Sequence, residues 1–109
     1  MSKLSLAIDL SRLRLRNPVM LSAGILGLSA PLLKRVYESG AGAVVTKSIG
    51  PNPRQGHPNP TVVAREYGLL NSMGLPNPGV DVFSEEVRSL KGYGVTVVAS
   101  IFGESIEEY

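Results

Sequence analysis

The sequence predicts an α/β fold in which short parallel strands alternate with helices. Three apolar runs carry this prediction: residues 19–22, 41–46 and 95–101. The run at 41–46 is small and β-branched without polar alternation, which is typical of a strand buried on both faces of a parallel sheet. Helical patterns separate the runs, so right-handed crossover connections are expected. Their order fits a doubly wound sheet or the beginning of a closed barrel, and it does not distinguish the two.

Before these strands, the chain predicts a small antiparallel hairpin. Residues 4–10 and 13–16 both alternate apolar with polar side chains, and the segment between them is short enough for a turn. Arg12, Arg14 and Arg16 alternate with leucines, so we interpret them as the solvent-facing side of a strand. No aromatic residues interleave with these arginines, which argues against a nucleic-acid interface.

Two helices are expected between the strands. Ser29 is a suitable N-cap for a helix over residues 30–39, which has a proline in its first turn and an apolar stripe. Asn77 is expected to cap a second helix, with Pro78 at its first position and Gly92 near its end. The chain therefore reads as strand, helix, strand, loop, helix, strand.

A long loop and one further helix start complete the pattern. Residues 50–60 are rich in proline, glycine and asparagine, so they are expected to form a long ordered loop, and such loops are usually functional. The segment from Ser105 to Glu108 has the pattern of a capping box that opens another helix. Because the chain ends at Tyr109, we expect the sequence to be the first part of a longer domain.

Composition limits the class of protein. The chain has 109 residues, of which 43% are hydrophobic and 18% charged, as in a soluble globular domain with one core. The absence of cysteine excludes disulfides, iron–sulfur clusters and thiolate zinc sites within these residues and favours the cytosol. No signal-peptide or membrane-span pattern is present, so we expect a cytoplasmic protein without membrane contact.

Polar groups follow the predicted strands where parallel-sheet enzymes bind ligands. Residues 23–24, 47–48 and 100–103 all come just past the carboxyl ends of strands. The stem of Lys47 leaves a buried strand, so its ammonium must find an anion or water. The glycine-containing turn that begins at Asn71 adds a carboxamide and backbone N–H groups. Together these groups predict a site for a planar anion.

Plainer interpretations of the same residues stay open. The Lys47 ammonium can simply reach solvent, and the Asn71 side chain can bond its own backbone in a turn. The glycine at position 24 can be an ordinary strand-to-loop residue. His57 is the sole histidine, and no cysteine, second histidine or suitably spaced carboxylate accompanies it. A metal site is therefore not expected.

Four motifs resemble the dihydroorotate dehydrogenase family. They are residues 17–24 (NPVMLSAG), 44–48 (VVTKS), 71–77 (NSMGLPN) and 97–103 (VVASIFG). The resemblance runs in order from about Leu4 to the end of the chain. It implies an FMN-containing (β/α)8 barrel that oxidises dihydroorotate to orotate in pyrimidine synthesis. It is closer to the soluble class 1 enzymes, and within these to the class 1B catalytic subunit that pairs with an iron–sulfur flavoprotein subunit and uses NAD.

This resemblance also implies the place of the chain in the fold. Residues 1–16 would be the hairpin that closes the barrel floor, and residues 17–109 the first three βα units of a truncated TIM barrel. A homo- or hetero-oligomer is expected. The catalytic base would lie beyond Tyr109. Two alternatives remain: a non-catalytic half-barrel that needs a partner chain, and a related FMN barrel that acts on dihydropyrimidines.

Finally, the resemblance implies roles for individual residues. Many bacterial members of the family carry serine at position 23 and asparagine at position 100, where this chain has alanine and serine. The residues implied to contact FMN are Ala23, Gly24, Lys47, Ser48 and Ser100. The residues implied to hold the substrate are Lys47, Asn71, Ser72, Met73, Gly74 and Leu75.

Overall fold

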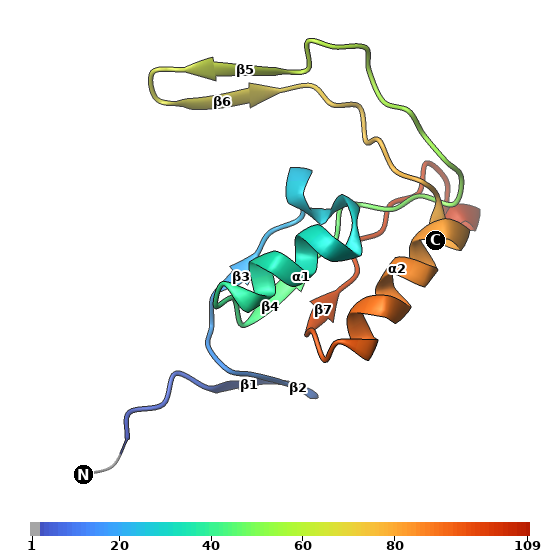
Figure 1. Ribbon diagram of the computed structural model, residues 1–109. Helices are drawn as coiled ribbons and strands as arrows, with labels where there is room; N and C mark the ends of the chain where they lie inside the picture. Colours follow the sequence, from blue (N-terminus) through green and yellow to red (C-terminus); the bar gives the residue numbers. More distant parts are fainter. Residues whose placement is uncertain (1–2) are drawn as a thin grey trace.

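A three-stranded parallel sheet forms the centre of the computed structural model, which describes residues 3–109 (Figure 1). The strands are β3 (Met20–Leu21), β4 (Ala43–Val45) and β7 (Val97–Val98), and they lie in the order β3-β4-β7. Both pairings are parallel. The predicted strands are therefore confirmed in order and direction, although each is shorter than the apolar run that predicted it.

Two helices pack against this sheet and against each other. Helix α1 spans Ala30–Glu38 and helix α2 spans Val80–Gly92. Both helices contribute to one apolar core, in which β4 is the central strand. Each fully buried leucine or valine side chain stabilises such a core by roughly 1.5–3 kcal/mol. The core consists of Ala30, Leu33, Val44, Ile49, Phe83, Leu90 and Val95.

The predicted start of the second helix is wrong. Gly79, and not Asn77, occupies the N-cap position of α2, so Pro78 lies outside the helix. The Asn77 side chain is engaged elsewhere: its Oδ1 accepts hydrogen bonds from the backbone amides of Gly79 (2.9 Å) and Gly50 (3.2 Å). Its Nδ2 donates to the Leu75 carbonyl at 2.9 Å. The buried carboxamide thus holds two loops together and does not cap the helix.

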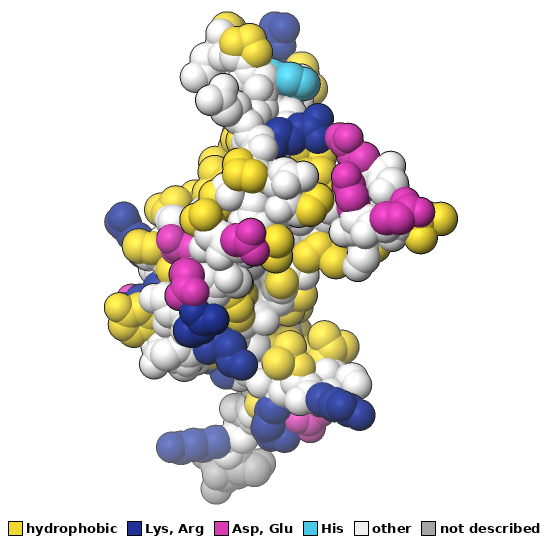
Figure 2. Space-filling view, turned by 90° about the vertical axis from the view of Figure 1, so that its right-hand side faces the viewer, with side chains coloured by type: hydrophobic (Ala, Val, Ile, Leu, Met, Phe, Trp, Pro, Cys, Tyr) yellow, Lys and Arg dark blue, Asp and Glu magenta, His cyan; other side chains and the backbone are white. Residues whose placement is uncertain are grey.

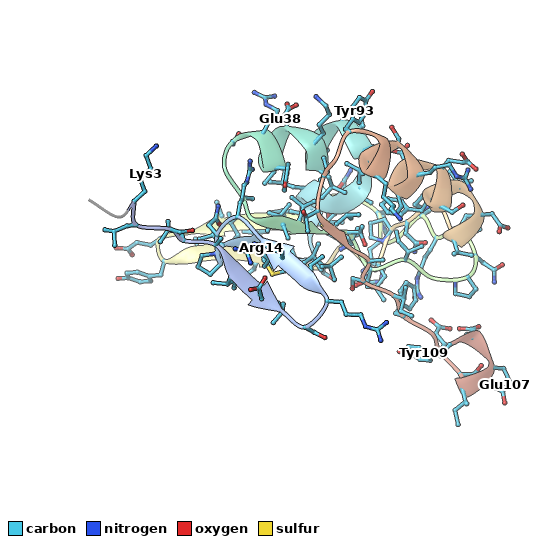
Figure 3. The ribbon with its side chains drawn as sticks, turned by 90° about the horizontal axis from the view of Figure 1, so that it is seen from below. Lys3, Arg14, Glu38, Tyr93, Glu107 and Tyr109 are labelled. Carbon is cyan, nitrogen blue, oxygen red and sulfur yellow. The ribbon has the colours of Figure 1, made fainter. Side chains whose placement is uncertain are left out.

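The N-terminal hairpin is confirmed for the residues described, while positions 1–2 lie outside them. It consists of β1 (Ile8–Leu10) and β2 (Leu13–Leu15), which pair antiparallel. Arg14 lies on its exposed side, where it forms a 3.0 Å ion pair with Asp9 (Figure 3). The interpretation of this arginine as a solvent-facing residue is confirmed.

Arg16 fixes the end of this hairpin to the body of the molecule. Its Nε and one terminal nitrogen donate to the Ala41 carbonyl at 2.9 and 2.7 Å, and the same terminal nitrogen contacts the Tyr37 carbonyl. The guanidinium also lies 4.1 Å from the centroid of the Tyr37 ring, a cation–π distance. These acceptors precede β4, so the hairpin lies at the amino ends of the parallel strands.

A second hairpin was not expected from the sequence. Strands β5 (Val62–Arg65) and β6 (Gly68–Asn71) pair antiparallel, and all of their residues are exposed. The hairpin projects from the sheet beyond the carboxyl ends of the strands (Figure 1). It contributes to a radius of gyration of 15.9 Å, compared with about 13 Å for a compact domain of this length.

The last segment also differs from the prediction. The capping-box pattern predicts an α-helix after Ser105, but the structure has only a 3₁₀ turn, η2 (Ile106–Glu108), without a side-chain cap. Hydrogen bonds from its own backbone amide and from the Ser105 hydroxyl lower the pKa of Glu107. Figure 3 shows this turn at the opposite end of the molecule from Lys3.

Both edges of the parallel sheet are open among the residues described, because β3 and β7 each pair with β4 alone. Several apolar side chains are also exposed, including Val82 of α2 at 58% and Ile101, which follows β7, at 60%. Figure 2 shows hydrophobic side chains between the basic N-terminal hairpin and the acidic C-terminal segment. None of the helices formed by residues 3–109 has the length and apolarity needed to cross a bilayer.

Candidate functional site

The carboxyl ends of β4 and β7 are joined by hydroxyl groups. Ser48 Oγ and Ser100 Oγ lie 2.9 Å apart and share a hydrogen bond. The Ser100 backbone amide donates to Oγ1 of Thr46 at 2.9 Å, and Thr46 is fully buried. The sequence did not single out this threonine, although its position at the end of a buried strand indicates a structural hydroxyl. Ser48 and Ser100, both predicted to contact the cofactor, therefore lie together.

The turn after β3 packs directly on Lys47. This turn is a short 3₁₀ helix, η1 (Ile25–Leu28). The Lys47 backbone amide donates to the Gly27 carbonyl at 2.9 Å, and a Cβ atom at Gly27 would lie only 2.2 Å from the Lys47 nitrogen. Glycine is therefore required at position 27. Ala23 and Gly24 lead into this turn, and a Cβ atom built at Gly24 meets nothing within 4 Å.

Lys47 carries a half-buried cation without a carboxylate partner in the described part of the chain. No hydrogen bond involves its Nζ among residues 3–109, in contrast to Lys34, whose Nζ lies 2.5 Å from Glu38. A partly buried ammonium is stabilised by an anion or by water. Lys47 is therefore suited to bind an anionic group at the carboxyl end of β4.

The turn that follows β6 presents a second set of polar groups. Asn71 is the last residue of β6, and its side chain makes no hydrogen bond to other described residues, so it does not bond its own backbone as one interpretation held. Gly74 and Leu75 both have left-handed backbones, with φ of 77° and 55°. Neither backbone amide donates a hydrogen bond within the described residues. The turn thus offers a carboxamide and two N–H groups for a ligand.

The long loop predicted at 50–60 is confirmed, and it supports this turn. The His57 backbone amide donates to the Met73 carbonyl at 2.9 Å, and the Ser72 amide donates to the Thr61 carbonyl at 2.8 Å. Nδ1 of His57 lies 3.1 Å from the Ser72 carbonyl. From the sequence, His57 was considered only as a metal ligand, and this contact was not predicted. No local sequence pattern indicates the contact, because His57 and Ser72 lie fifteen positions apart in the chain.

The predicted site residues form two groups. One group gathers around the ends of β3, β4 and β7, and the other follows β6. Hydrogen bonds occur within each group and its supporting loop, but none joins the two groups among residues 3–109. The first group consists of Ala23, Gly24, Lys47, Ser48 and Ser100, and the second of Asn71, Ser72, Met73, Gly74 and Leu75. No group of three or more metal-ligating side chains occurs in the residues described.

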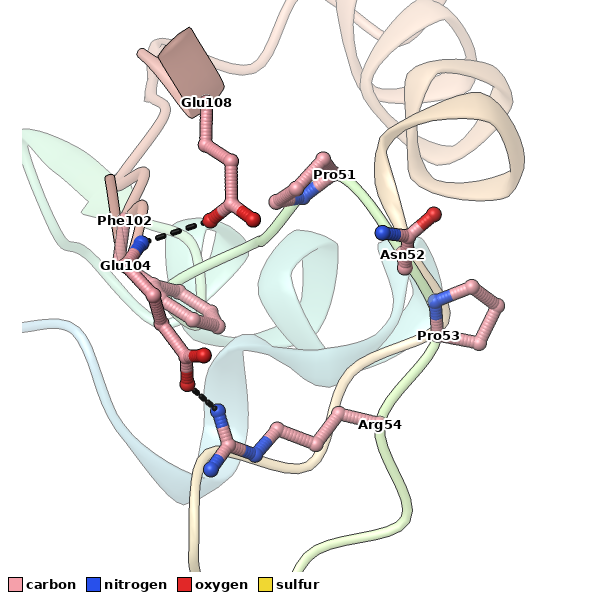
Figure 4. Close-up of a pocket in the computed structure, with 7 residues that line it drawn as sticks. All are labelled: Pro51, Asn52, Pro53, Arg54, Phe102, Glu104 and Glu108. Carbon is pink, nitrogen blue, oxygen red and sulfur yellow. Dashed lines mark hydrogen bonds and ion pairs between the residues drawn. The ribbon is translucent and has the colours of Figure 1, made fainter. Parts of the chain in front are cut away.

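A cavity of about 180 Å³ lies between the long loop and the segment that follows β7 (Figure 4). Its walls are residues 51–54 of the long loop and the segment after β7, including Phe102. Arg54 and Glu104 form a 2.7 Å ion pair across it, and the Glu104 amide donates to Glu108 at 2.6 Å. None of the predicted site residues lines this cavity. The ion pair connects the long loop with the end of the chain.

Comparison with known proteins decides between the possible parallel-sheet families. The model of the family described as dihydroorotate dehydrogenase matches residues 5–109. The chain belongs to the dihydroorotate dehydrogenase family. The match covers all of the motifs that suggested this family and both groups of site residues.

Curated dihydroorotate dehydrogenases from archaea are similar to this chain. The catalytic subunit of dihydroorotate dehydrogenase B (NAD(+)) from Pyrococcus abyssi is 47% identical over 104 residues, which are 95% of this chain and 34% of the relative. The subunit of the same name from Methanocella arvoryzae is 50% identical over 97 residues, covering 89% of this chain and 32% of the relative. The chain thus spans about a third of the length of these dihydroorotate dehydrogenases.

Solved dihydroorotate dehydrogenase structures share the fold of the chain. The ligand-free enzyme from Eimeria tenella superposes with a TM-score of 0.78 at 22% identity, over 88% of this chain and 29% of that one. Its complex with ferulenol gives a TM-score of 0.75 at the same identity. The mixed α/β arrangement is therefore that of part of a dihydroorotate dehydrogenase.

Proposed function

We propose that the protein oxidises dihydroorotate to orotate with FMN in pyrimidine synthesis. The observation that carries this proposal is the half-buried Lys47, an unpaired cation at the carboxyl end of β4 in a chain of this family. A fixed positive charge at this position is suited to stabilise an anion that forms during the reaction. The relatives that carry the name dihydroorotate dehydrogenase supply the substrate class.

We further propose that the chain is the N-terminal part of one FMN-binding (β/α)8 barrel. Residues 1–16 would form the floor hairpin, and residues 17–109 the first three βα units. The parallel order β3-β4-β7 supports this assignment, as does the span of about a third of each relative. A barrel of this kind needs roughly 250 residues. In such a barrel the two open edges would be paired by further strands.

The first group of residues fits a flavin. FMN, when bound, accepts a hydride from the substrate. The open space beside Gly24 allows a flat ring to approach the backbone. The Ser48 and Ser100 hydroxyls share one hydrogen bond, so one of them keeps its hydrogen to donate to the polar edge of the ring. Lys47 would stabilise the negative charge that reaches that edge on reduction. Ala23 would contact the same ring through its short side chain.

The second group of residues fits a pyrimidine carboxylate. The backbone amides of Gly74 and Leu75 make no hydrogen bonds within residues 3–109, and they would receive the carboxylate. The Asn71 carboxamide has both a donor and an acceptor, so it would pair with the amide edge of the ring. Ser72 and Met73 would complete the turn that presents these groups. Lys47, which belongs to the first group, would also contact the substrate.

The names of the relatives suggest a partner chain. Each is called a catalytic subunit of an NAD(+)-linked enzyme, which implies at least one further subunit. We propose that this protein also works in a hetero-oligomer, with an iron–sulfur flavoprotein subunit passing electrons to NAD. Its cytoplasmic location stays a prediction from the composition.

The test uses protein expressed from the complete reading frame and kept free of oxygen. We expect a yellow protein whose extracted flavin is FMN. Dihydroorotate should bleach its visible absorption, and orotate should shift the flavin spectrum. A flavin that dihydrouracil bleaches while dihydroorotate does not would favour the alternative, a related barrel acting on dihydropyrimidines. A colourless protein that remains colourless with added FMN would contradict the proposal.

A further inference from the structure

We propose that His57 is a positioning residue that holds the turn from Asn71 to Leu75 in the shape that receives orotate. This inference rests on the proposed function, because it assigns the ligand of that turn to a pyrimidine carboxylate. His57 itself comes from the long loop and lies on the supporting side of the turn. It acts through the turn and does not contact the reacting atoms.

Backbone contacts bring the loop and the turn together. The His57 amide donates to the Met73 carbonyl at 2.9 Å. Gly56 lies so close that a Cβ atom there would be 2.3 Å from the same carbonyl oxygen. A Cβ atom at Gly74 would lie 2.8 Å from Cδ2 of the His57 ring. The imidazole therefore packs directly behind the glycine whose backbone amide is free for a ligand.

The imidazole also contacts Ser72 through Nδ1. Nδ1 of His57 lies 3.1 Å from the Ser72 carbonyl oxygen, which can only accept, so this hydrogen bond forms in the tautomer that carries the hydrogen on Nδ1. The Ser72 hydroxyl lies 3.2 Å from the same nitrogen and serves as a second acceptor. Protonation of Nε2 leaves the Nδ1–H donor in place. The contact therefore needs a donor at the Nδ1 position and does not need a charge.

The shape that this contact supports is an unusual one. Gly74 and Leu75 are consecutive residues in the left-handed region, with φ of 77° and 55°. Leucine is disfavoured in this region, so the surrounding contacts must hold it there. The loop holds the turn through three contacts: His57 amide to Met73, Nδ1 to Ser72, and Thr61 to the Ser72 amide. Of these, only the Nδ1 contact depends on a side chain.

The test compares three substitutions in protein from the complete reading frame. His57→Asn places a carboxamide nitrogen close to the former Nδ1 and keeps the donor. His57→Gln is the matched control, because its nitrogen falls near the former Nε2 and is directed away from Ser72. His57→Ala removes the donor altogether. Orotate affinity is measured by titrating the change in the flavin spectrum, and FMN content is measured in parallel.

We expect His57→Ala and His57→Gln to weaken orotate binding about five- to tenfold, which corresponds to the loss of one ordinary hydrogen bond. His57→Asn should stay within about twofold of the wild type by the same reasoning. FMN content should not change, because the flavin residues belong to the other group. Equal orotate affinity in the alanine variant and the wild type would overturn the proposal.

A second measurement does not depend on a bound ligand. Hydrogen exchange of the Ser72 amide, which donates to Thr61 at 2.8 Å, reports whether the turn is held. Exchange should accelerate in His57→Ala and recover in His57→Asn, and unchanged exchange would contradict the role of His57. Wild-type protein that does not bind orotate would overturn the proposed function and the role of His57 at the substrate. The exchange result would then still decide whether His57 holds the turn.

Discussion

Lys47 combines two properties that seldom occur together in a structural lysine. It follows a buried strand, with Thr46 before it fully buried, and its own ammonium is unpaired among the residues described. Most exposed lysines, in contrast, extend into solvent or form weak surface pairs such as Lys34 with Glu38. The side chain of Lys47 is therefore more suited to bind a ligand than to stabilise the fold.

Replacing this cation tests its role directly. Lys47→Ala should slow flavin reduction by dihydroorotate and weaken orotate binding, because in the proposed site one ammonium would serve both the ring and the substrate. A hydrogen bond to a charged group contributes about 1.5–3 kcal/mol, so kcat/KM should fall roughly ten- to hundredfold. Anaerobic stopped-flow absorbance measures the reduction. Lys34→Ala is the matched control, since it makes the same change in net charge and should leave the rate unchanged.

Gly74 offers a second test at this scale, with Gly94 as its control. Both glycines have similar left-handed backbones, with φ of 77° and 73°, but a Cβ atom meets His57 at Gly74 and open space at Gly94. Gly94→Ala should therefore cost about 1 kcal/mol for the backbone alone. Gly74→Ala should cost about 2–4 kcal/mol, because overpacking adds about 1–3 kcal/mol. Urea unfolding measures the loss of stability in both variants. Equal losses would argue against close packing of His57 on Gly74.

The residues proposed for the site were chosen from residue type and from position along the sequence. Lys47 was singled out because a charged side chain at the end of a buried apolar strand needs an anion or water, and Asn71 because a glycine-containing turn begins there. His57 was missed as a supporting residue, because its partner Ser72 lies fifteen positions away and only the folded chain brings them together. Sequence patterns report on neighbours along a helix or strand, and they do not report on contacts between loops.

At the scale of elements, the buried Asn77 connects the long loop, the turn from Asn71 to Leu75 and the start of α2. Asn77→Ala leaves the backbone amides of Gly50 and Gly79 without their acceptor, and both residues are buried. Each unsatisfied buried amide costs about 1–3 kcal/mol, so the free energy of unfolding should fall by about 2–6 kcal/mol. Chemical denaturation measures the change. Asn52→Ala, at an exposed position, should stay within about 0.5 kcal/mol of the wild type.

Most of the elements could be predicted, and the exceptions have physical causes. The N-terminal hairpin and the parallel strands follow from periodicity and β-branched composition. The β5–β6 hairpin was missed because its exposed strands mix apolar and polar residues without a regular alternation. The start of α2 was misplaced because Asn77 has the composition of a cap, yet its side chain bonds loop amides. For Asn77, the contact with Gly50 twenty-seven positions away outweighed the local pattern.

At the scale of the whole molecule, the described chain buries only a small core and leaves its sheet open. Its long dimension is 55 Å and its short dimension 26 Å, and both hairpins project from the centre. Unpaired strand edges and exposed apolar side chains favour association with other chains. A protein that closes its sheet through further strands would cover these edges.

The open edges predict that residues 1–109 and the protein from the complete reading frame differ in association and in flavin content. Residues 1–109 expressed alone should associate as the concentration rises, because the open edges of β3 and β7 can pair between copies. They should also lack flavin absorption, because only part of the proposed site is present. Analytical ultracentrifugation and visible spectra measure both properties. A monomeric, yellow fragment would show that these residues alone form a closed flavin site, and it would favour a self-sufficient half-barrel over the larger barrel proposed above.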